Sequence, residues 1–191
     1  MRAPLLFVNT ALASGLNELL RRLEDELDLS RQLKVYIAGG MAVHLYTGAR
    51  VTTDVDAEFS ARILVPKELM IEVTLENGKR QVIFLDTNYN STFGLMHEDY
   101  QDDALLVPFE FEHIALYVLS PVDLVVSKIA RWAENDREDL SALVSAGLVT
   151  AAQIEERALA AQIGFVGGQA MLKLNIRDAV ATAREVEAHI R

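Results

Sequence analysis

The chain has 191 residues, 51% of them hydrophobic, which is enough apolar material for a globular core. It has no cysteine, so disulfide frameworks and zinc sites built on thiolates are excluded. Its formal net charge of −10 argues against broad, sequence-independent binding to DNA, which requires many cations. The N-terminus lacks a basic region followed by an apolar core, and no apolar run approaches about 18 residues, so we expect a soluble, cytoplasmic protein with no membrane partner.

The first predicted element is a helix that begins after Asn9 or Thr10 and runs to about Leu29. Its leucines recur at helical spacing on one side, at Leu12, Leu16, Leu19, Leu20, Leu23 and Leu27. Charged residues occupy the opposite side, so the pattern predicts a helix that packs on a sheet.

The stretch from Val35 to Phe59 contains the most informative pattern of the chain. Residues 35–37 predict a short strand, which Gly39 and Gly40 end with a tight turn. Residues 41–46 have the length and propensity of a short helix, and residues 52–59 predict a second strand.

Acidic residues alternate along that second predicted strand. Asp54, Asp56 and Glu58 are two residues apart, so their side chains share one face. Neighbouring carboxylates repel each other, and a divalent cation such as Mg²⁺ removes this cost while also binding phosphate oxygens. A glycine-rich turn beside such a pair offers backbone N–H groups to phosphates.

Further along the chain, residues 67–73 fit either a helix or a strand, and residues 80–85 predict a strand that ends at Asp86. Residues 105–111 and 114–119 predict two strands of a hairpin.

The C-terminal part of the chain is predicted to be helical. Ser120 and Pro121 mark a helix start, and three further helices are expected at residues 137–146, 151–163 and 176–190. We therefore expect an α/β (α+β) core at residues 1–119 and a helical subdomain at residues 120–191.

Two motifs carry a family resemblance. A Gly-Gly pair, a short helix and an R-x-T-x-D-x-D strand resemble the signature of the polymerase-beta-like nucleotidyltransferase superfamily, here as Gly39, Gly40, Arg50, Thr52, Asp54 and Asp56. A helix lysine followed by D-x-x-D resembles the helical segment of the minimal bacterial branch, which includes toxin and abortive-infection nucleotidyltransferases, here as Lys128, Asp136 and Asp139. The resemblance implies a small mixed sheet flanked by helices.

The resemblance also implies a site and a reaction. Asp54 and Asp56 would hold two Mg²⁺ ions, and Asp86 at the end of the strand at 80–85 would be the third carboxylate, with Glu110 as the alternative. Gly39 and Gly40 would cradle the phosphates of a nucleoside triphosphate (NTP), and Arg50 or Lys128 would neutralise them. The implied reaction moves a nucleoside monophosphate from the NTP to an acceptor.

Several alternatives stay open at the level of sequence. The acceptor is a tRNA 3′ end, another RNA, a protein side chain or a small molecule. The resemblance to toxins implies a small antitoxin partner. A further hypothesis is a toxin–antitoxin component that acts by binding alone. The alternative to an enzyme is a catalytically degenerate module of the same fold that binds nucleotides or proteins.

Overall fold

The computed structural model describes residues 4–66 and 69–190, and these residues form a mixed α+β fold with two small sheets. The chain divides into two compact units. The first comprises Met1–Tyr89 and Ala104–Val118, and the second comprises Asn90–Asp103 and Leu119–Arg191. Residues 90–103 lie in the second unit together with the helical segment that begins at Leu119.

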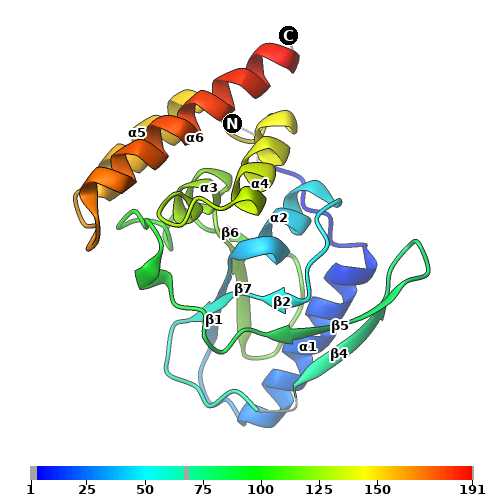
Figure 1. The fold of residues 1–191 in the computed structure, drawn as a ribbon. Helices are drawn as coiled ribbons and strands as arrows, with labels where there is room; N and C mark the ends of the chain where they lie inside the picture. The colour runs from blue at the N-terminus through cyan, green and yellow to red at the C-terminus, as the bar shows by residue number, and fades with distance from the viewer. Residues whose placement is uncertain (1–3, 67–68, 191) are drawn as a thin grey trace. The chain divides into compact units, whose positions relative to one another are not determined.

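The elements follow one another along the chain in the order labelled in Figure 1. The first unit contains α1 (Ala11–Leu27), β1 (Leu33–Ile37), α2 (Gly39–Thr47), β2 (Asp54–Val55), β3 (Ala57–Phe59), β4 (Met70–Thr74), β5 (Arg80–Leu85), β6 (Leu105–Leu106) and β7 (Ile114–Val118). The second unit contains a 3₁₀ turn, η1 (Ser91–Phe93), followed by α3 (Pro121–Ile129), α4 (Glu134–Ser145), α5 (Ala151–Gln162) and α6 (Gln169–Ile190).

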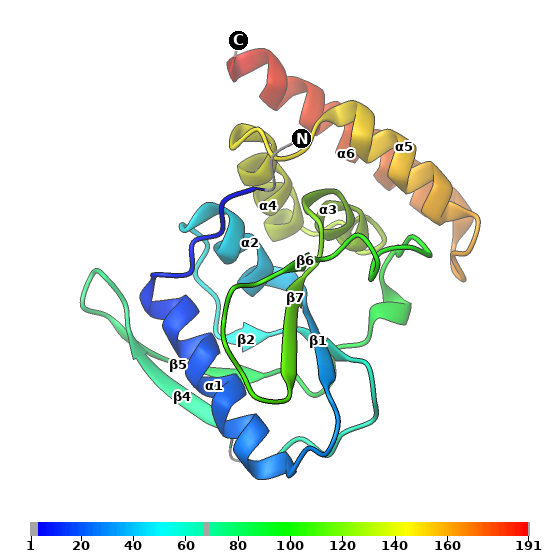
Figure 2. The same ribbon diagram turned by 180° about the vertical axis from the view of Figure 1, so that it is seen from behind.

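Helix α1 confirms the predicted amphipathic helix. The side chain of Thr10 caps it by accepting a hydrogen bond from the N–H of Ala13 at 3.1 Å. Its buried face lies against β4 and β5 (Figure 2). At Gly15 the approach is so close that an added Cβ would lie 2.4 Å from Cγ1 of Val73 and 3.0 Å from Cδ1 of Ile83. The inner face of this sheet is therefore tightly covered by α1.

The four-stranded sheet has the order β3-β1-β7-β6, with β1 and β7 parallel and both outer strands antiparallel to their neighbours. The three-stranded sheet has the order β2-β5-β4, with β2 parallel and β4 antiparallel to β5. The undecided segment at 67–73 therefore contributes a strand, Met70–Thr74, whereas Lys67 and Glu68 lie outside the described residues.

The strand predicted at residues 52–59 is divided between the two sheets. Asp54 and Val55 pair with β5, whereas Ala57 to Phe59 pair with β1. Asp56 is the residue at which the chain leaves one sheet and enters the other. The prediction of a single strand was wrong because the local pattern does not show that two different strands supply the hydrogen bonds.

The hairpin predicted at residues 105–119 was also wrong in its first strand. β6 pairs only at Leu105 and Leu106, and the N–H of Val107 adds one bond to the carbonyl of Leu116 at 2.9 Å. Pro108 comes next and has no N–H to donate, so the ladder stops there. The carboxylate of Glu24 accepts the N–H groups that lead into β7, including that of Ile114 at 2.8 Å.

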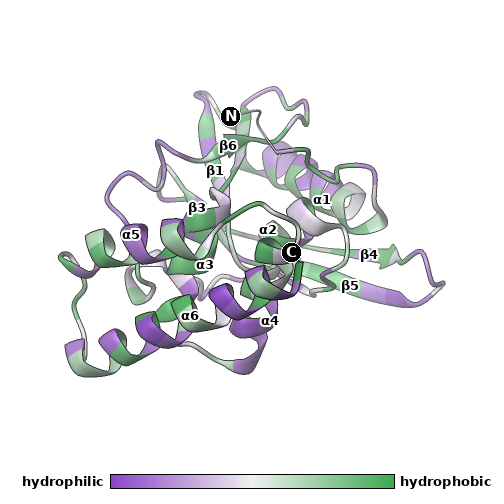
Figure 3. Ribbon diagram, turned by 90° about the horizontal axis from the view of Figure 1, so that it is seen from above, coloured by the Kyte–Doolittle hydropathy of each residue, from purple (hydrophilic) through white to green (hydrophobic). Residues whose placement is uncertain are grey.

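In the second unit, α4 and α6 both begin earlier than predicted. α4 starts at Glu134 rather than residue 137, and α6 starts at Gln169 rather than residue 176. Hydrophilic and hydrophobic stretches alternate along α5 and α6 in Figure 3. Among the residues that the structure describes, no helix combines the length and the apolarity needed to cross a bilayer.

Candidate active site

The Gly-Gly pair forms the first turn of α2 instead of a separate turn before it. Gly39 has a φ of 57°, in the left-handed region that favours glycine. A Cβ added to Gly39 would lie 1.7 Å from Oδ2 of Asp56 and 2.7 Å from its carboxyl carbon. The carboxylate of Asp56 therefore packs directly on the backbone at the N-terminus of a helix, where the helix dipole favours a negative charge.

Gly40 permits a second close approach. A Cβ added there would lie 3.0 Å from both Cβ and Oγ1 of Thr52. The hydroxyl of Thr52, which is almost buried, donates a hydrogen bond of 2.6 Å to Oδ1 of Asp54. Each glycine thus makes room for part of the acidic strand: Gly39 for Asp56 itself, and Gly40 for the threonine that orients Asp54.

The loop between α2 and the acidic strand is held by a buried histidine. The ring of His44 contacts the carbonyl of Arg50 through Nδ1 at 2.7 Å and the hydroxyl of Thr10 through Nε2 at 2.6 Å. Because a carbonyl only accepts, Nδ1 carries the proton and Nε2 accepts from Thr10. His44 is therefore a neutral anchor that connects the start of α1 to the segment leading to Thr52.

Protonation of His44 should weaken the fold. Burial lowers the pKa of His44 below its ordinary value of 6.5 and outweighs the opposing effect of the Arg50 carbonyl. Between the lowered and the ordinary pKa the unfolded chain binds more protons, so the free energy of unfolding rises with pH and levels off above 6.5, with a slope of at most about 1.4 kcal/mol per pH unit. Urea unfolding measured from pH 5 to 8 should show this slope in the wild type and lose it in His44→Asn.

The matched control is His189→Asn, which removes an exposed histidine near the end of α6 and should leave the slope unchanged. An equal slope in the wild type and in His44→Asn would contradict the assignment of His44 as the neutral anchor.

The register of β2 and β5 bears on which residue is the third carboxylate. Asp54 pairs with Phe84 and Val55 pairs with Leu85, so Asp86 is the next residue along, beside Asp56. The N–H of Asp86 extends the ladder by bonding the carbonyl of Val55 at 3.0 Å. Adjacent strands lie about 4.8 Å apart, which brings Asp86 near the acidic pair.

The competing residue, Glu110, lies at the other end of the four-stranded sheet. It comes before β7, whose first residue, Ile114, pairs with Leu33 at the start of β1. Gly39 follows the opposite end of β1, about 13 Å further along the strand direction at 3.3 Å per residue. The topology of the first unit thus brings Asp86, and not Glu110, toward Asp54 and Asp56.

The carboxylate of Asp86 also has a local role. Its Oδ1 accepts the N–H of Asn88 at 2.8 Å, as in an Asx turn. Among residues 4–66 and 69–190, no three acidic or histidine side chains are gathered closely enough to hold a metal ion by themselves. The structure therefore presents a pair of acids with a third directly after the end of β5, rather than a closed metal cage.

The acidic pair fits Mg²⁺ when a substrate supplies the remaining ligands. Carboxylate oxygens are the hard donors that Mg²⁺ prefers, and in phosphate-binding sites it commonly uses one or two carboxylates with water and phosphate oxygens. The close packing of Asp56 on Gly39 keeps one of these carboxylates at the helix N-terminus. Asp54 and Asp56 would hold the ion.

Lys128 lies in the second unit and already has anionic neighbours. Its Nζ is 3.0 Å from Oδ2 of Asp139 and 3.7 Å from Oδ1 of Asp136. Burial opposes ionisation of Asp136, but hydrogen bonds from Arg131 and from the N–H of Ala133, with the charge of Lys128, outweigh it and hold the pKa of Asp136 below its usual value. The D-x-x-D pair thus caps and braces α4, and contact between Lys128 and phosphate stays a prediction.

Substituting Lys128 by methionine should destabilise the protein by about 3–5 kcal/mol, because the change removes the cation that two buried carboxylates share, and only Asp136 keeps a bidentate contact with Arg131. Urea denaturation measures the loss. Lys173→Met, at an exposed lysine on α6, is the matched control and should change stability by less than about 0.5 kcal/mol. A Lys128→Met protein that is as stable as wild type but has a raised KM for NTP would support the phosphate contact instead.

The orienting role of Thr52 could not be assigned from the sequence. Thr52 is part of the R-x-T-x-D-x-D pattern, but its hydrogen bond to Asp54 requires the extended geometry that the structure shows. The anchoring role of His44 is likewise invisible locally, because its partner Thr10 is 34 residues away.

Comparison with known proteins gives the family. The model of a family described as "Nucleotidyltransferase of unknown function (DUF6036)" matches residues 14–180. No curated protein and no solved structure matched the chain significantly. The matched region includes the acidic strand, both glycines and all of β5. Since the match covers most of the sequence, this chain belongs to the DUF6036 family of nucleotidyltransferases.

Proposed function

We propose that this protein is a metal-dependent nucleotidyltransferase that moves a nucleoside monophosphate from an NTP to an acceptor hydroxyl. The observation that carries the proposal is the packing of the Asp56 carboxylate on Gly39 at the N-terminus of α2, with Asp54 oriented by Thr52 two residues earlier. This arrangement combines backbone N–H groups that favour phosphate with carboxylates that favour Mg²⁺.

Each residue of the candidate site has a distinct role in the proposal. The N-terminus of α2, at Gly39 and Gly40, receives the phosphates of the NTP. Asp54 and Asp56 would hold the divalent ions, which would neutralise charge on the phosphates. Arg50 adds positive charge beside the acidic strand.

The chemical step is an in-line displacement at the α-phosphorus. The acceptor oxygen forms a bond to the α-phosphorus while the bond to the oxygen between the α- and β-phosphorus atoms breaks, and pyrophosphate leaves. The proton of the acceptor hydroxyl passes to the carboxylate of Asp86. Catalysis of this kind depends mainly on positioning and electrostatics, which suits a small site.

A labelling experiment tests the reaction class. The protein is incubated with Mg²⁺, total RNA or cell lysate, and each NTP labelled at the α-phosphate, and in parallel at the γ-phosphate. We expect transfer of the α-label and no transfer of the γ-label, with loss of transfer when EDTA is added. Transfer of the γ-label would indicate a kinase, and no transfer from any of the four NTPs would refute the proposal.

The second candidate is a non-catalytic nucleotide-binding or protein-binding module of the same fold. The observation in its favour is that no three metal-binding side chains are grouped in the described part of the chain. Calorimetry would separate the two: binding of Mg²⁺–NTP without label transfer supports the module. The toxin role and a small helical antitoxin partner remain predictions, tested by co-purification of such a partner from the native host.

A further inference from the structure

The outer face of the β2-β5-β4 sheet carries apolar residues that nothing in the first unit covers. Met70, Val82 and Phe84 are 51%, 40% and 43% exposed. On the same strands, Val73 and Ile83 face α1 and are buried. The alternation along β4 and β5 therefore places an aromatic and two aliphatic side chains on the side of the sheet away from α1.

The acidic strand presents Asp54 on this same face. Asp54 pairs with Phe84 across the parallel ladder, and Phe84 pairs with Met70 across the antiparallel one. These three residues form a row across the sheet, with the carboxylate at one end and the aromatic ring in the middle. The row begins at the candidate active site. A molecule that binds on Phe84 would therefore place its adjacent reactive group next to Asp54.

The in-line geometry of the reaction indicates which of the two substrates would bind on the Phe84 side of the site. Asp56 has the backbone of Ala38 and Gly39 on one side and β5 on the other, as shown by the hydrogen bonds from the N–H of Ala38 to the carbonyl of Asp56 and from the N–H of Asp86 to the carbonyl of Val55. If the phosphates occupy the α2 side, the attacking oxygen must approach from the opposite side, because attacking and leaving oxygens are in line. β5 borders that side, and Phe84 is the residue of β5 that pairs with Asp54.

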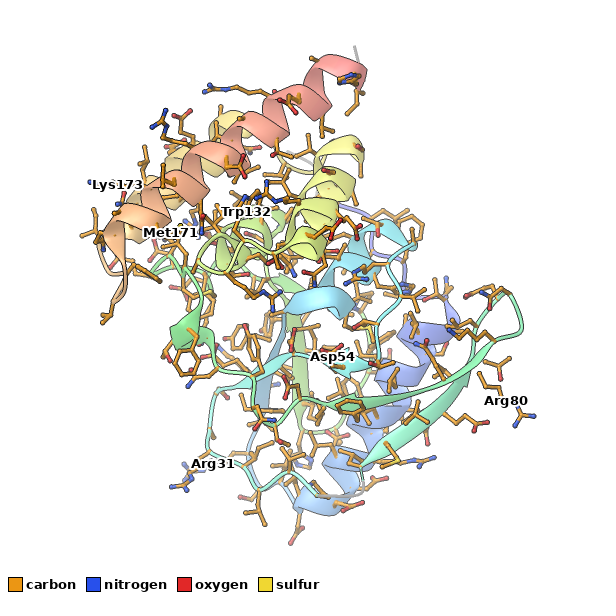
Figure 4. The ribbon with its side chains drawn as sticks, in the orientation of Figure 1. Arg31, Asp54, Arg80, Trp132, Met171 and Lys173 are labelled. Atoms are coloured by element: carbon orange, nitrogen blue, oxygen red, sulfur yellow. The ribbon has the colours of Figure 1, made fainter. Side chains whose placement is uncertain are left out.

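We propose, on the basis of the proposed function, that this face is the acceptor site and that Phe84 stacks on the 3′-terminal base of a single-stranded polynucleotide. Aromatic side chains on an open sheet bind unpaired bases in this way. Arg80 lies on the same face of β5, about 14 Å from Phe84 at 3.4 Å per residue, and its guanidinium is 3.4 Å from the carboxylate of Glu72. An exposed ion pair of this kind contributes little stability, so Arg80 can exchange Glu72 for a phosphate further along the strand. Figure 4 shows Asp54 on β2 and Arg80 at the start of β5.

The charge of the chain agrees with an end-binding site. A net charge of −10 disfavours extended contact with a duplex, whereas stacking of one terminal base requires few phosphate contacts. A protein side chain as acceptor would not explain a flat aromatic ring centred beside Asp54, although it would explain exposed apolar groups in general.

The test is a binding experiment that does not depend on turnover. A short single-stranded RNA with 2-aminopurine as its 3′-terminal base is titrated with the Asp54→Asn/Asp56→Asn protein, and its fluorescence reports stacking. We expect quenching by the parent and by its Phe84→Tyr variant. In Phe84→Leu the quenching should be lost and the affinity should fall by on the order of 10-fold. Phe93→Leu, at an aromatic residue that is 80% exposed in the second unit, is the matched control and should bind as the parent does.

A probe with 2-aminopurine at its 5′ end should show no quenching. Equal binding and quenching by Phe84→Leu and its parent, or equal quenching of both probes, would overturn the proposal. The outcome is separable from that of the labelling experiment: α-label transferred only to protein, with no quenching of the RNA probe, refutes the acceptor site and leaves the nucleotidyltransferase in place. Quenching that depends on Phe84 without any label transfer supports the stacking site and refutes only the chemistry.

Discussion

Replacing Asp56 by asparagine should reduce nucleotidyl transfer by roughly 10³-fold, because the change removes one of the two carboxylates that would hold the divalent ions, and these ions would neutralise the developing negative charge. Asparagine has nearly the same shape, so the packing on Gly39 is retained and the melting temperature should change little. Asp54→Asn should have an effect of similar size. Initial rates of α-label transfer at saturating NTP measure both losses.

Glu58→Gln is the matched control for these variants. It removes the same charge two residues further along, on β3, where the chain pairs with Tyr36 of β1 and no longer with β5. Its transfer rate should stay within a few-fold of wild type. A rate in Glu58→Gln as low as that in Asp56→Asn would mean that general loss of negative charge, and not the pair at Asp54 and Asp56, explains the defect.

Gly39→Ala should both unfold the protein more easily and abolish transfer. Two costs add at this position: a left-handed φ of 57°, and a Cβ that would lie 1.7 Å from Oδ2 of Asp56. Together they are worth about 2–5 kcal/mol, from about 1–2 kcal/mol for the conformation and about 1–3 kcal/mol for overpacking. Thermal or urea denaturation gives the stability, and the labelling experiment gives the activity.

Gly78→Ala separates the two costs. Gly78 also has a left-handed φ, 80°, but an added Cβ would meet nothing within 4 Å. Its substitution should cost only the conformational term, about 1–2 kcal/mol. In a double-mutant cycle, Asp56→Ala should reduce the cost of Gly39→Ala toward that of Gly78→Ala, because the colliding carboxylate is gone. Additive effects of the two substitutions would show that the carboxylate does not pack on this glycine.

Much of the first unit follows from local sequence. Three predictions are confirmed: the leucine spacing of α1, its N-cap at Thr10, and the strand at 80–85. The short helix predicted at 41–46 is also present, but α2 begins earlier, at Gly39. These features depend on residues within one or two turns of each other, so periodicity and capping are sufficient to predict them. The nucleotidyltransferase family likewise follows from the motif.

The placement of the site residues required the fold. The acidic strand changes sheets at Asp56, and this depends on hydrogen bonds to β1 and β5, which are distant in sequence. The same pairing puts Asp86 beside Asp56 and leaves Glu110 at the other end of the four-stranded sheet. No local pattern distinguishes these two acids, because both lie directly beside apolar residues: Asp86 follows residues 82–85, and Glu110 lies between two phenylalanines.

The sequence by itself therefore determined the presence of an acid pair after a glycine pair, because both are short-range patterns with restricted backbone chemistry. Only the tertiary structure decided what each glycine accommodates and which face of β5 stays open. The run Val82 to Leu85 is apolar throughout, so it does not reveal which of its side chains are buried. That was settled by the packing of α1 against Val73 and Ile83, which covers one face and leaves Phe84 exposed beside Asp54.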